Sequence, residues 1–238
     1  MPDQTGTAFE EALRSLNTRL FAHVRSQTGE GDRLSLLALQ NACRETYEEF
    51  SYLEIGSHLG GSLQALIVDE RCSHIVSIDS RPEQQPDDRG FVADYPGNST
   101  QRMLERLGSV PGGDLGKVHT IEATTAEISA DDLPVRPQLC LIDAEHTFEA
   151  ALRDARFCRA ATGDDGAIAF HDRRVVRPAI ERFLDELEST PHDSYPLLGS
   201  VYVIELGKTR LRPVVEELLA GRGERKPFLI DHPSRKFP

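Results

Sequence analysis

Four side chains that could hold a cation or move a proton lie at the ends of two short apolar segments. Asp143 ends the segment QLCLID and His146 follows three residues later, whereas His171 and Asp172 end the segment AIAFHD. Carboxylate oxygens suit Mg²⁺, and a site that adds imidazole also accepts Mn²⁺. We therefore predict a divalent-cation site at Asp143, His171 and Asp172. The alternative is that the two acids form hydrogen bonds without a metal.

His146 is the candidate general base. An unperturbed imidazole has a pKa of about 6.5, which suits removal of a hydroxyl proton around neutral pH. The alternative is a histidine that caps the following helix or supports a neighbouring group. Glu145 is a rival base, but an acid here is typical of the solvent-exposed first turn of a helix.

A second group of candidate residues surrounds a glycine-rich turn after SYLEIG. The turn supplies an acid, three glycines and two serines: Glu54, Gly56, Ser57, Gly60, Gly61 and Ser62. Glycines let the backbone turn tightly and approach a ligand at the start of a helix. The spacing E-x-G-x-x-x-G differs from the G-x-G-x-x-G of dinucleotide-binding proteins. An acid at the entrance of the turn favours a cationic group such as an α-amino group, whereas an ordinary strand-to-helix turn is the alternative.

Two later segments offer groups for a nucleoside. Asp79 lies 23 residues after Gly56, and an acid about 20 residues beyond such a turn commonly accepts hydrogen bonds from ribose hydroxyls. Thr124 stands in the small polar run EATTAE, where a base edge could be recognised. The alternative for Asp79 is a solvated acid at the exit of a strand.

These residues need strands that end at one edge of a sheet. Apolar segments alternate with helical segments along the chain, which is typical of a parallel sheet covered on both faces. We predict strands over 51–56, 74–79, 117–123, 138–143 and 167–172, and a closing hairpin over 194–207. We predict helices over 8–25, 34–49, 60–70, 98–110, 147–161 and 175–190. The polar segment 80–97 is predicted to be a loop without regular structure.

Composition narrows the class of protein. The chain has 238 residues, of which 39% are hydrophobic and 28% charged, so it can bury a large core. Its net charge of −12 disfavours a nucleic-acid partner. No segment is apolar enough to cross a membrane and no signal-peptide core is visible. Four cysteines form no CxxC pair and are predicted to be buried and reduced: Cys43, Cys72, Cys140 and Cys158. We therefore predict a cytoplasmic protein with no membrane partner.

The motifs YLEIGSHLGGS, SIDSRP and LIDAEHTFEAALRDARFCRAATGDDGAIAFHD together resemble class I S-adenosylmethionine-dependent methyltransferases. Within that superfamily the chain resembles small-molecule O-methyltransferases related to macrolide-sugar methyltransferases and cephalosporin-hydroxylase-like proteins. The resemblance covers roughly residues 50–206. It implies an α/β fold with a Rossmann-like sheet of seven mostly parallel strands, helices on both faces and an antiparallel last strand. We expect a helical cap over 1–50, the S-adenosylmethionine-binding domain over 51–207, and a tail over 208–238 that acts as a lid or contact segment.

The resemblance also assigns roles by position. Glu54, Gly56, Gly60 and Gly61 would hold the amino-acid end of S-adenosylmethionine, and Asp79 would hold its ribose. Thr124 would lie near adenine. The remaining residues of the predicted cofactor site are Ser57, Ser62 and Asp143. In related metal-dependent enzymes the positions of Asp143, His171 and Asp172 are usually all acidic, so His171 is a departure.

The expected activity is methyl transfer from S-adenosylmethionine to a hydroxyl of a small molecule such as a sugar or natural product. Mg²⁺ or Mn²⁺ would assist, and Asp143 and His146 would be catalytic. One alternative is a metal-independent methyltransferase. Another is a non-catalytic binding module, which the joint presence of Glu54, Asp79, Asp143 and His146 disfavours. The glycine spacing disfavours a nicotinamide-dependent dehydrogenase. The sequence leaves the acceptor open and is compatible with a homo-oligomer.

Overall fold

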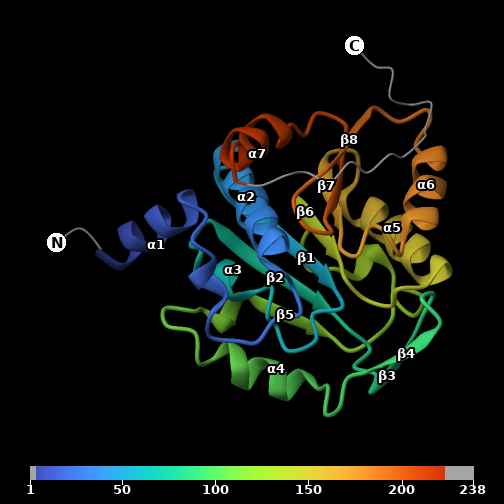
Figure 1. The fold of residues 1–238 in the computed structure, drawn as a ribbon, viewed down its shortest axis with the longest axis horizontal. Coiled ribbons are helices and arrows are strands. Elements are labelled where there is room, and N and C mark those ends of the chain that lie inside the picture. Colours follow the sequence, from blue (N-terminus) through green and yellow to red (C-terminus); the bar gives the residue numbers. More distant parts are fainter. Residues whose placement is uncertain (1–3, 223–238) are drawn as a thin grey trace.

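A seven-stranded sheet forms the centre of the protein in a computed structural model, which describes residues 4–222 (Figure 1). The strands in spatial order are β5 (Val118–Ile121), β2 (Cys72–Ile78), β1 (Phe50–Ile55), β6 (Leu139–Ile142), β7 (Gly166–Phe170), β9 (Tyr202–Leu206) and β8 (His192–Pro196). Neighbours from β5 to β7 are parallel, whereas β9 is antiparallel to both β7 and β8. The predicted mostly parallel sheet with an antiparallel last strand is therefore confirmed.

The direction in which the chain adds strands reverses between β1 and β6. The chain proceeds from β1 to β2 and β5 on one side, and then returns to place β6 and β7 on the other. In open α/β sheets, ligands bind at the carboxyl ends of the strands beside such a switch point. Glu54 and Asp143 lie at this point, because the last residues of the two strands, Ile55 and Ile142, pair with each other.

Helices cover both faces of the sheet (Figure 1). The apolar core on one face includes side chains of α1 (Gln4–Arg14), α2 (Glu30–Thr46), α3 (Gln64–Val68), α4 (Thr100–Leu107) and α7 (Arg212–Leu219). The core on the other face includes side chains of α5 (Phe148–Thr162) and α6 (Arg177–Glu186). Strand residues alternate between the two, as a period of two requires: Cys140 and Ile142 of β6 belong to the second core, whereas Leu139 and Leu141 belong to the first. Short 3₁₀ turns are η1 (Thr18–Phe21), η2 (Leu115–Lys117) and η3 (Ala130–Asp132).

The prediction of one continuous helix over 8–25 is wrong. Helix α1 ends at Arg14, Leu16 adopts a φ of 54°, and η1 follows. The Asn17 side chain accepts a hydrogen bond from the Arg19 amide at 3.1 Å, and such local bonds compete with a continuing helix. The second helix begins at Glu30, earlier than predicted, and Asp32 in its first turn accepts a hydrogen bond from the Gly29 amide at 2.8 Å.

The segment 80–97 is not the irregular loop that we predicted. It contains a hairpin of β3 (Gln84–Asp87) and β4 (Phe91–Asp94), which lies apart from the main sheet (Figure 1). The two strands are short and contain proline and polar residues, so their sequences lack the apolar periodicity that predicts a strand. The amide of Asp88, the residue after β3, donates to the carbonyl of His146 at 3.1 Å, so the hairpin is attached to the region of the predicted base.

The C-terminal part of the described chain contributes to the fold itself, because α7 packs on α2. The rest of the predicted tail, residues 223–238, lies outside the described residues. All four cysteines are buried and free, as predicted. Among residues 4–222, no helix has the length and apolar character needed to span a membrane.

Candidate active site

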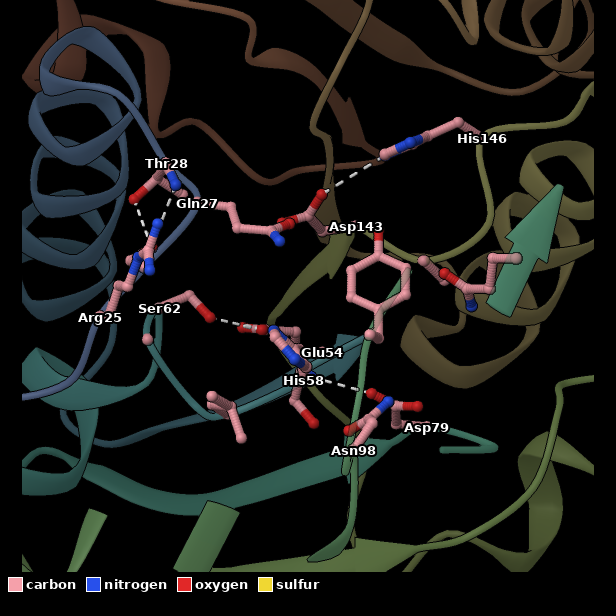
Figure 2. A pocket seen from close by; sticks show the side chains of 18 residues that line it. Arg25, Gln27, Thr28, Glu54, His58, Ser62, Asp79, Asn98, Asp143 and His146 are labelled. Atoms are coloured by element: carbon pink, nitrogen blue, oxygen red, sulfur yellow. Dashed lines mark hydrogen bonds and ion pairs between the residues drawn. The ribbon is translucent and has the colours of Figure 1, made fainter. Parts of the chain in front are cut away.

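Glu54 lies near the end of β1 with no exposed surface (Figure 2). Its carboxylate accepts hydrogen bonds from the Tyr52 hydroxyl at 2.7 Å and from the Ser62 hydroxyl at 2.5 Å. Burial raises the pKa of Glu54 to about 7, although both hydrogen bonds act in the opposite direction. A cationic group that reached this carboxylate would therefore favour its ionised form.

Gly56 allows the ends of β1 and β6 to approach each other. It adopts a φ of 90°, and a Cβ at this position would lie 2.3 Å from the Asp143 carbonyl oxygen. Gly61 likewise allows the segment before α2 to approach closely, since a Cβ at this position would lie 2.7 Å from Cα of Ser26. The glycine-rich turn is thus enclosed between β6 and the segment that leads into α2.

Asp79 follows β2 and is held by the turn beside it. Its carboxylate accepts a hydrogen bond from the His58 amide at 2.8 Å (Figure 2). It accepts another from the Arg81 amide at 2.7 Å. The Arg81 guanidinium lies 3.3 Å from the same carboxylate and also donates to the Ser57 hydroxyl at 3.2 Å. The orientation of Asp79 is therefore fixed.

Two adjoining hollows share Gly56, Asp79, Gln85 and Ala144. The first hollow is lined by most of the predicted cofactor residues: Glu54, Gly56, Ser57, Gly61, Ser62, Asp79 and Asp143. The second hollow contains Thr124, whose hydroxyl donates to Glu127 at 2.8 Å. Gly60 does not line either hollow; a Cβ there would lie 2.8 Å from the Leu107 side chain. The two hollows follow the carboxyl edge of β1, β2 and β5.

A third hollow joins the first at Asp143 and His146. Asp143 Oδ1 lies 3.8 Å from His146 Nε2 (Figure 2). The same oxygen lies 2.9 Å from His171 Nδ1. These three side chains offer ligand atoms that all lie within 4.8 Å of one another. Asp172 is outside that trio, although its Oδ2 lies 3.3 Å from His146 Nε2. Of the three predicted metal residues, Asp143 and His171 therefore belong to this trio, whereas His146 occupies the place predicted for Asp172, which lies beside it.

Each imidazole has a second carboxylate on its far side. His146 Nδ1 lies 3.1 Å from Asp87 Oδ2, and His171 Nε2 lies 3.4 Å from Asp32 Oδ2. Burial alone would lower the pKa of both histidines, but the neighbouring carboxylates outweigh it and raise both. Burial would likewise raise the pKa of Asp143, yet His171 and His146 hold it below its usual value.

The sequence over residues 53–173, just over half of the chain, matches the model of a family described as a methyltransferase domain. This chain belongs to that methyltransferase family. No protein of curated function matches the sequence of the methyltransferase significantly. The family match confirms the identification of the chain as a class I S-adenosylmethionine-dependent methyltransferase. The methyl donor of the protein is S-adenosylmethionine.

Solved structures of methyltransferases share the fold. The O-methyltransferase NovP has a TM-score of 0.61 at 10% identity, over 86% of this chain and 100% of that chain. A candidate O-methyltransferase from Klebsiella pneumoniae has a TM-score of 0.52 at 12% identity, over 87% and 91% of the two chains. A candidate caffeoyl-CoA O-methyltransferase from Staphylococcus aureus has a TM-score of 0.52 at 12% identity, over 86% and 92%. At these identities the likeness is one of fold.

Several charged residues of the methyltransferase site were not predicted from the sequence, among them Asp32, Arg81 and Asp87. Asp32 comes from the first turn of α2, where an acid is also favoured by the helix dipole. Arg81 and Asp87 come from the segment 80–97, which has no apolar pattern. Only the position of Arg81, two residues after Asp79, offered a signal.

Proposed function

We propose that the protein methylates a hydroxyl group of a small molecule and that a divalent cation assists. The observation that carries this proposal is the junction of the first and third hollows at Asp143 and His146. A methyl group leaving a donor in the first hollow would have to pass this junction to reach an acceptor in the third. Holding both reactants there converts a bimolecular step into an effectively unimolecular one, which lowers the activation free energy by several kcal/mol.

Cofactor binding is assigned to the first and second hollows. Glu54 is the partner for the α-ammonium group, since it is an acid buried beside a turn of small residues. Asp79 would accept hydrogen bonds from the ribose, and Thr124 lies in the second hollow where the base would extend. Arg81 keeps the Asp79 carboxylate in place and neutralises part of its charge.

Proton removal is assigned to His146. The Asp87 carboxylate accepts a hydrogen bond from Nδ1–H, which leaves the lone pair of Nε2 directed at the junction. Asp87 is therefore a positioning residue that fixes the tautomer of the base. His146 Nε2 would take the proton of the acceptor hydroxyl.

The residues around Asp143 fit a divalent cation. Within residues 4–222, both ring nitrogens of His171 and Nε2 of His146 are buried and lack a hydrogen bond of acceptable geometry. Asp143, His171 and Asp172 would hold the cation, which when bound lowers the pKa of a hydroxyl and favours a neighbouring oxygen of the same molecule. We therefore favour an acceptor with two adjacent oxygens, such as a vicinal diol, over a nucleic acid.

The second candidate function is methyl transfer without a metal. It is favoured by the short contact of His171 with Asp143, since two protonated imidazoles would balance the carboxylates around them without an added cation. A chelator separates this candidate from the first.

Transfer of an isotopically labelled methyl group from S-adenosylmethionine tests the proposal. Among sugars, catechols, simple alcohols, amines and RNA, we expect label in molecules with adjacent oxygens, and at least about tenfold less label after chelation by EDTA. Labelling of amines or RNA without labelling of hydroxyl compounds would contradict the proposal. Full transfer in EDTA would favour the metal-independent candidate.

A further inference from the structure

His171 stands where a carboxylate would be expected in a Mg²⁺ site. Only 9% of its side-chain surface is exposed. Nδ1 lies 2.9 Å from Asp143 Oδ1 and 4.0 Å from Asp172 Oδ1. Neither ring nitrogen makes a hydrogen bond of acceptable geometry within the described residues. A buried imidazole nitrogen thus lies between two carboxylates without a well-formed hydrogen bond.

The Asp32 carboxylate faces this imidazole from the opposite side. Its Oδ1 accepts hydrogen bonds from the amide and the hydroxyl of Ser200, at 2.6 and 2.9 Å, and its Oδ2 accepts one from the Gly29 amide at 2.8 Å. The carboxylate is therefore rigid, and its Oδ2 lies 3.4 Å from His171 Nε2. A histidine that binds a metal usually directs its other ring nitrogen to such a carboxylate, which fixes the tautomer and ring orientation.

The two histidines differ in what they face. His146 lines both the first and the third hollow, so it can reach reactants on either side. His171 lines only the third hollow and lies beside Asp143. This difference favours His146 as the base and His171 as a ligand.

The charges around the two imidazoles also favour a cation. Asp32, Asp87, Asp143 and Asp172 surround them, and Arg89 supplies one positive charge, with its guanidinium 2.6 Å from Asp87 and 3.8 Å from Asp172. With both imidazoles neutral, a divalent ion would offset most of the remaining negative charge. Imidazole is a preferred ligand of Zn²⁺, Fe²⁺ and similar ions, whereas Mg²⁺ prefers oxygen.

Resting on the cation of the proposed function, we propose that His171 binds that cation directly through Nδ1, beside Asp143 and Asp172. The site accordingly selects a transition-metal ion such as Mn²⁺, Fe²⁺ or Zn²⁺ over Mg²⁺. Asp32 is the positioning residue for this ligand. Of the two ions expected from the sequence, Mg²⁺ and Mn²⁺, the proposal therefore retains Mn²⁺, which accepts a nitrogen ligand more readily.

Electron spin echo envelope modulation of the Mn²⁺-loaded protein tests the nitrogen ligand, because it detects a directly bound ¹⁴N. The signal should be present in the parent and in the His146→Ala variant, and absent in His171→Asp. A parent without the signal would overturn the proposal, as would its persistence in His171→Asp. Loss in His146→Ala alone would assign the ligand to the other imidazole and overturn it as well.

Titration with Mn²⁺ alone and Mg²⁺ alone tests the selectivity. His171→Asp creates three acidic positions, so the preference for Mn²⁺ over Mg²⁺ should fall at least about tenfold. The exposed control His74→Asp should keep the parental ratio. An unchanged ratio in His171→Asp would overturn the proposal. Binding of S-adenosylhomocysteine verifies that each variant is folded, and His171→Asn, which should also lose the ¹⁴N signal, replaces the aspartate variant if that one does not fold.

Asp32→Asn tests the positioning residue. It should weaken Mn²⁺ binding by about 10–100-fold and leave the affinity for S-adenosylhomocysteine unchanged, which a general loss of structure would not do. Parental Mn²⁺ affinity in this variant would overturn the positioning role. These measurements need no acceptor, so a parent that transfers methyl groups but shows no ¹⁴N signal would overturn the nitrogen ligand and leave the proposed function standing.

Discussion

Replacement of His146 by alanine is expected to lower the turnover of methyl transfer by about 10²–10⁴-fold, the usual contribution of a general base. The affinity for S-adenosylmethionine should hardly change, because the imidazole is assigned to the acceptor oxygen. Burial opposes protonation of His146, but Asp143, Asp172 and Asp87 raise its pKa above the usual value. The parental rate should rise with pH through a midpoint in the neutral range, as the imidazole loses its proton.

Measurement of turnover against pH decides this prediction, with the exposed His119→Ala as the matched control. Asp87→Asn should retain the base but shift the midpoint downward, because it removes a carboxylate that stabilises the protonated imidazole. If His146→Ala retained near-parental turnover and the parental pH profile, the cation or simple alignment would be the activating agent instead.

Replacement of Asp143 by alanine is the second large effect that we expect. The carboxylate is assigned to the cation, so its loss should reduce cation-stimulated turnover by at least about 100-fold, the scale of losing metal-ion assistance. S-adenosylmethionine should remain largely bound, since Glu54 and Asp79 are unchanged. Metal content, turnover with and without added cation, and donor affinity are the quantities to measure.

The exposed Asp131→Ala is the matched control for this loss of charge. Asp143→Asn shows whether the charge or the volume of the side chain matters, and it should behave like the alanine variant. Parental turnover in excess EDTA, together with no metal in the purified protein, would remove the cation from the mechanism.

The sheet and the position of the site could be predicted because both follow from local pattern. Each central strand is a short apolar run that ends in a polar residue or glycine, and parallel strands end at the same edge of a sheet. Asp79, Asp143 and His171 could therefore be placed at one edge without knowledge of any contact. Burial on both faces produces such runs, as in β6, where all four residues are buried.

The partners of these residues could not be predicted, because they come from segments without periodicity. Asp87 belongs to a hairpin whose sequence, QQPD, has neither alternation nor an apolar face. Asp32 contacts His171 across 139 positions of the chain, and this contact depends on how α2 packs against the sheet. The end of α1 was missed for a similar reason, since Asn17 caps the next turn by a bond that residue spacing does not show.

Glu54 is the group through which the central claim, a binding site for S-adenosylmethionine in the first hollow, can be tested. Burial raises its pKa from 4.5 to about 7 in the free protein. The α-ammonium group would bind the ionised carboxylate, so a protonated Glu54 must lose its proton when the ligand binds. Affinity should therefore be constant above pH 7 and should fall as pH decreases below it, by up to about tenfold per unit.

The most direct measurement is a calorimetric titration of S-adenosylhomocysteine into the protein between pH 6 and 7.5. We expect one site, an affinity about tenfold weaker at pH 6 than at the plateau, and proton release at the lower pH. The Glu54→Gln variant should bind more weakly by roughly 1–3 kcal/mol without this pH dependence, whereas the exposed control Glu105→Gln should behave like the parent. Absence of binding to the folded parent, or parental affinity and pH dependence in Glu54→Gln, would contradict the assignment of this site.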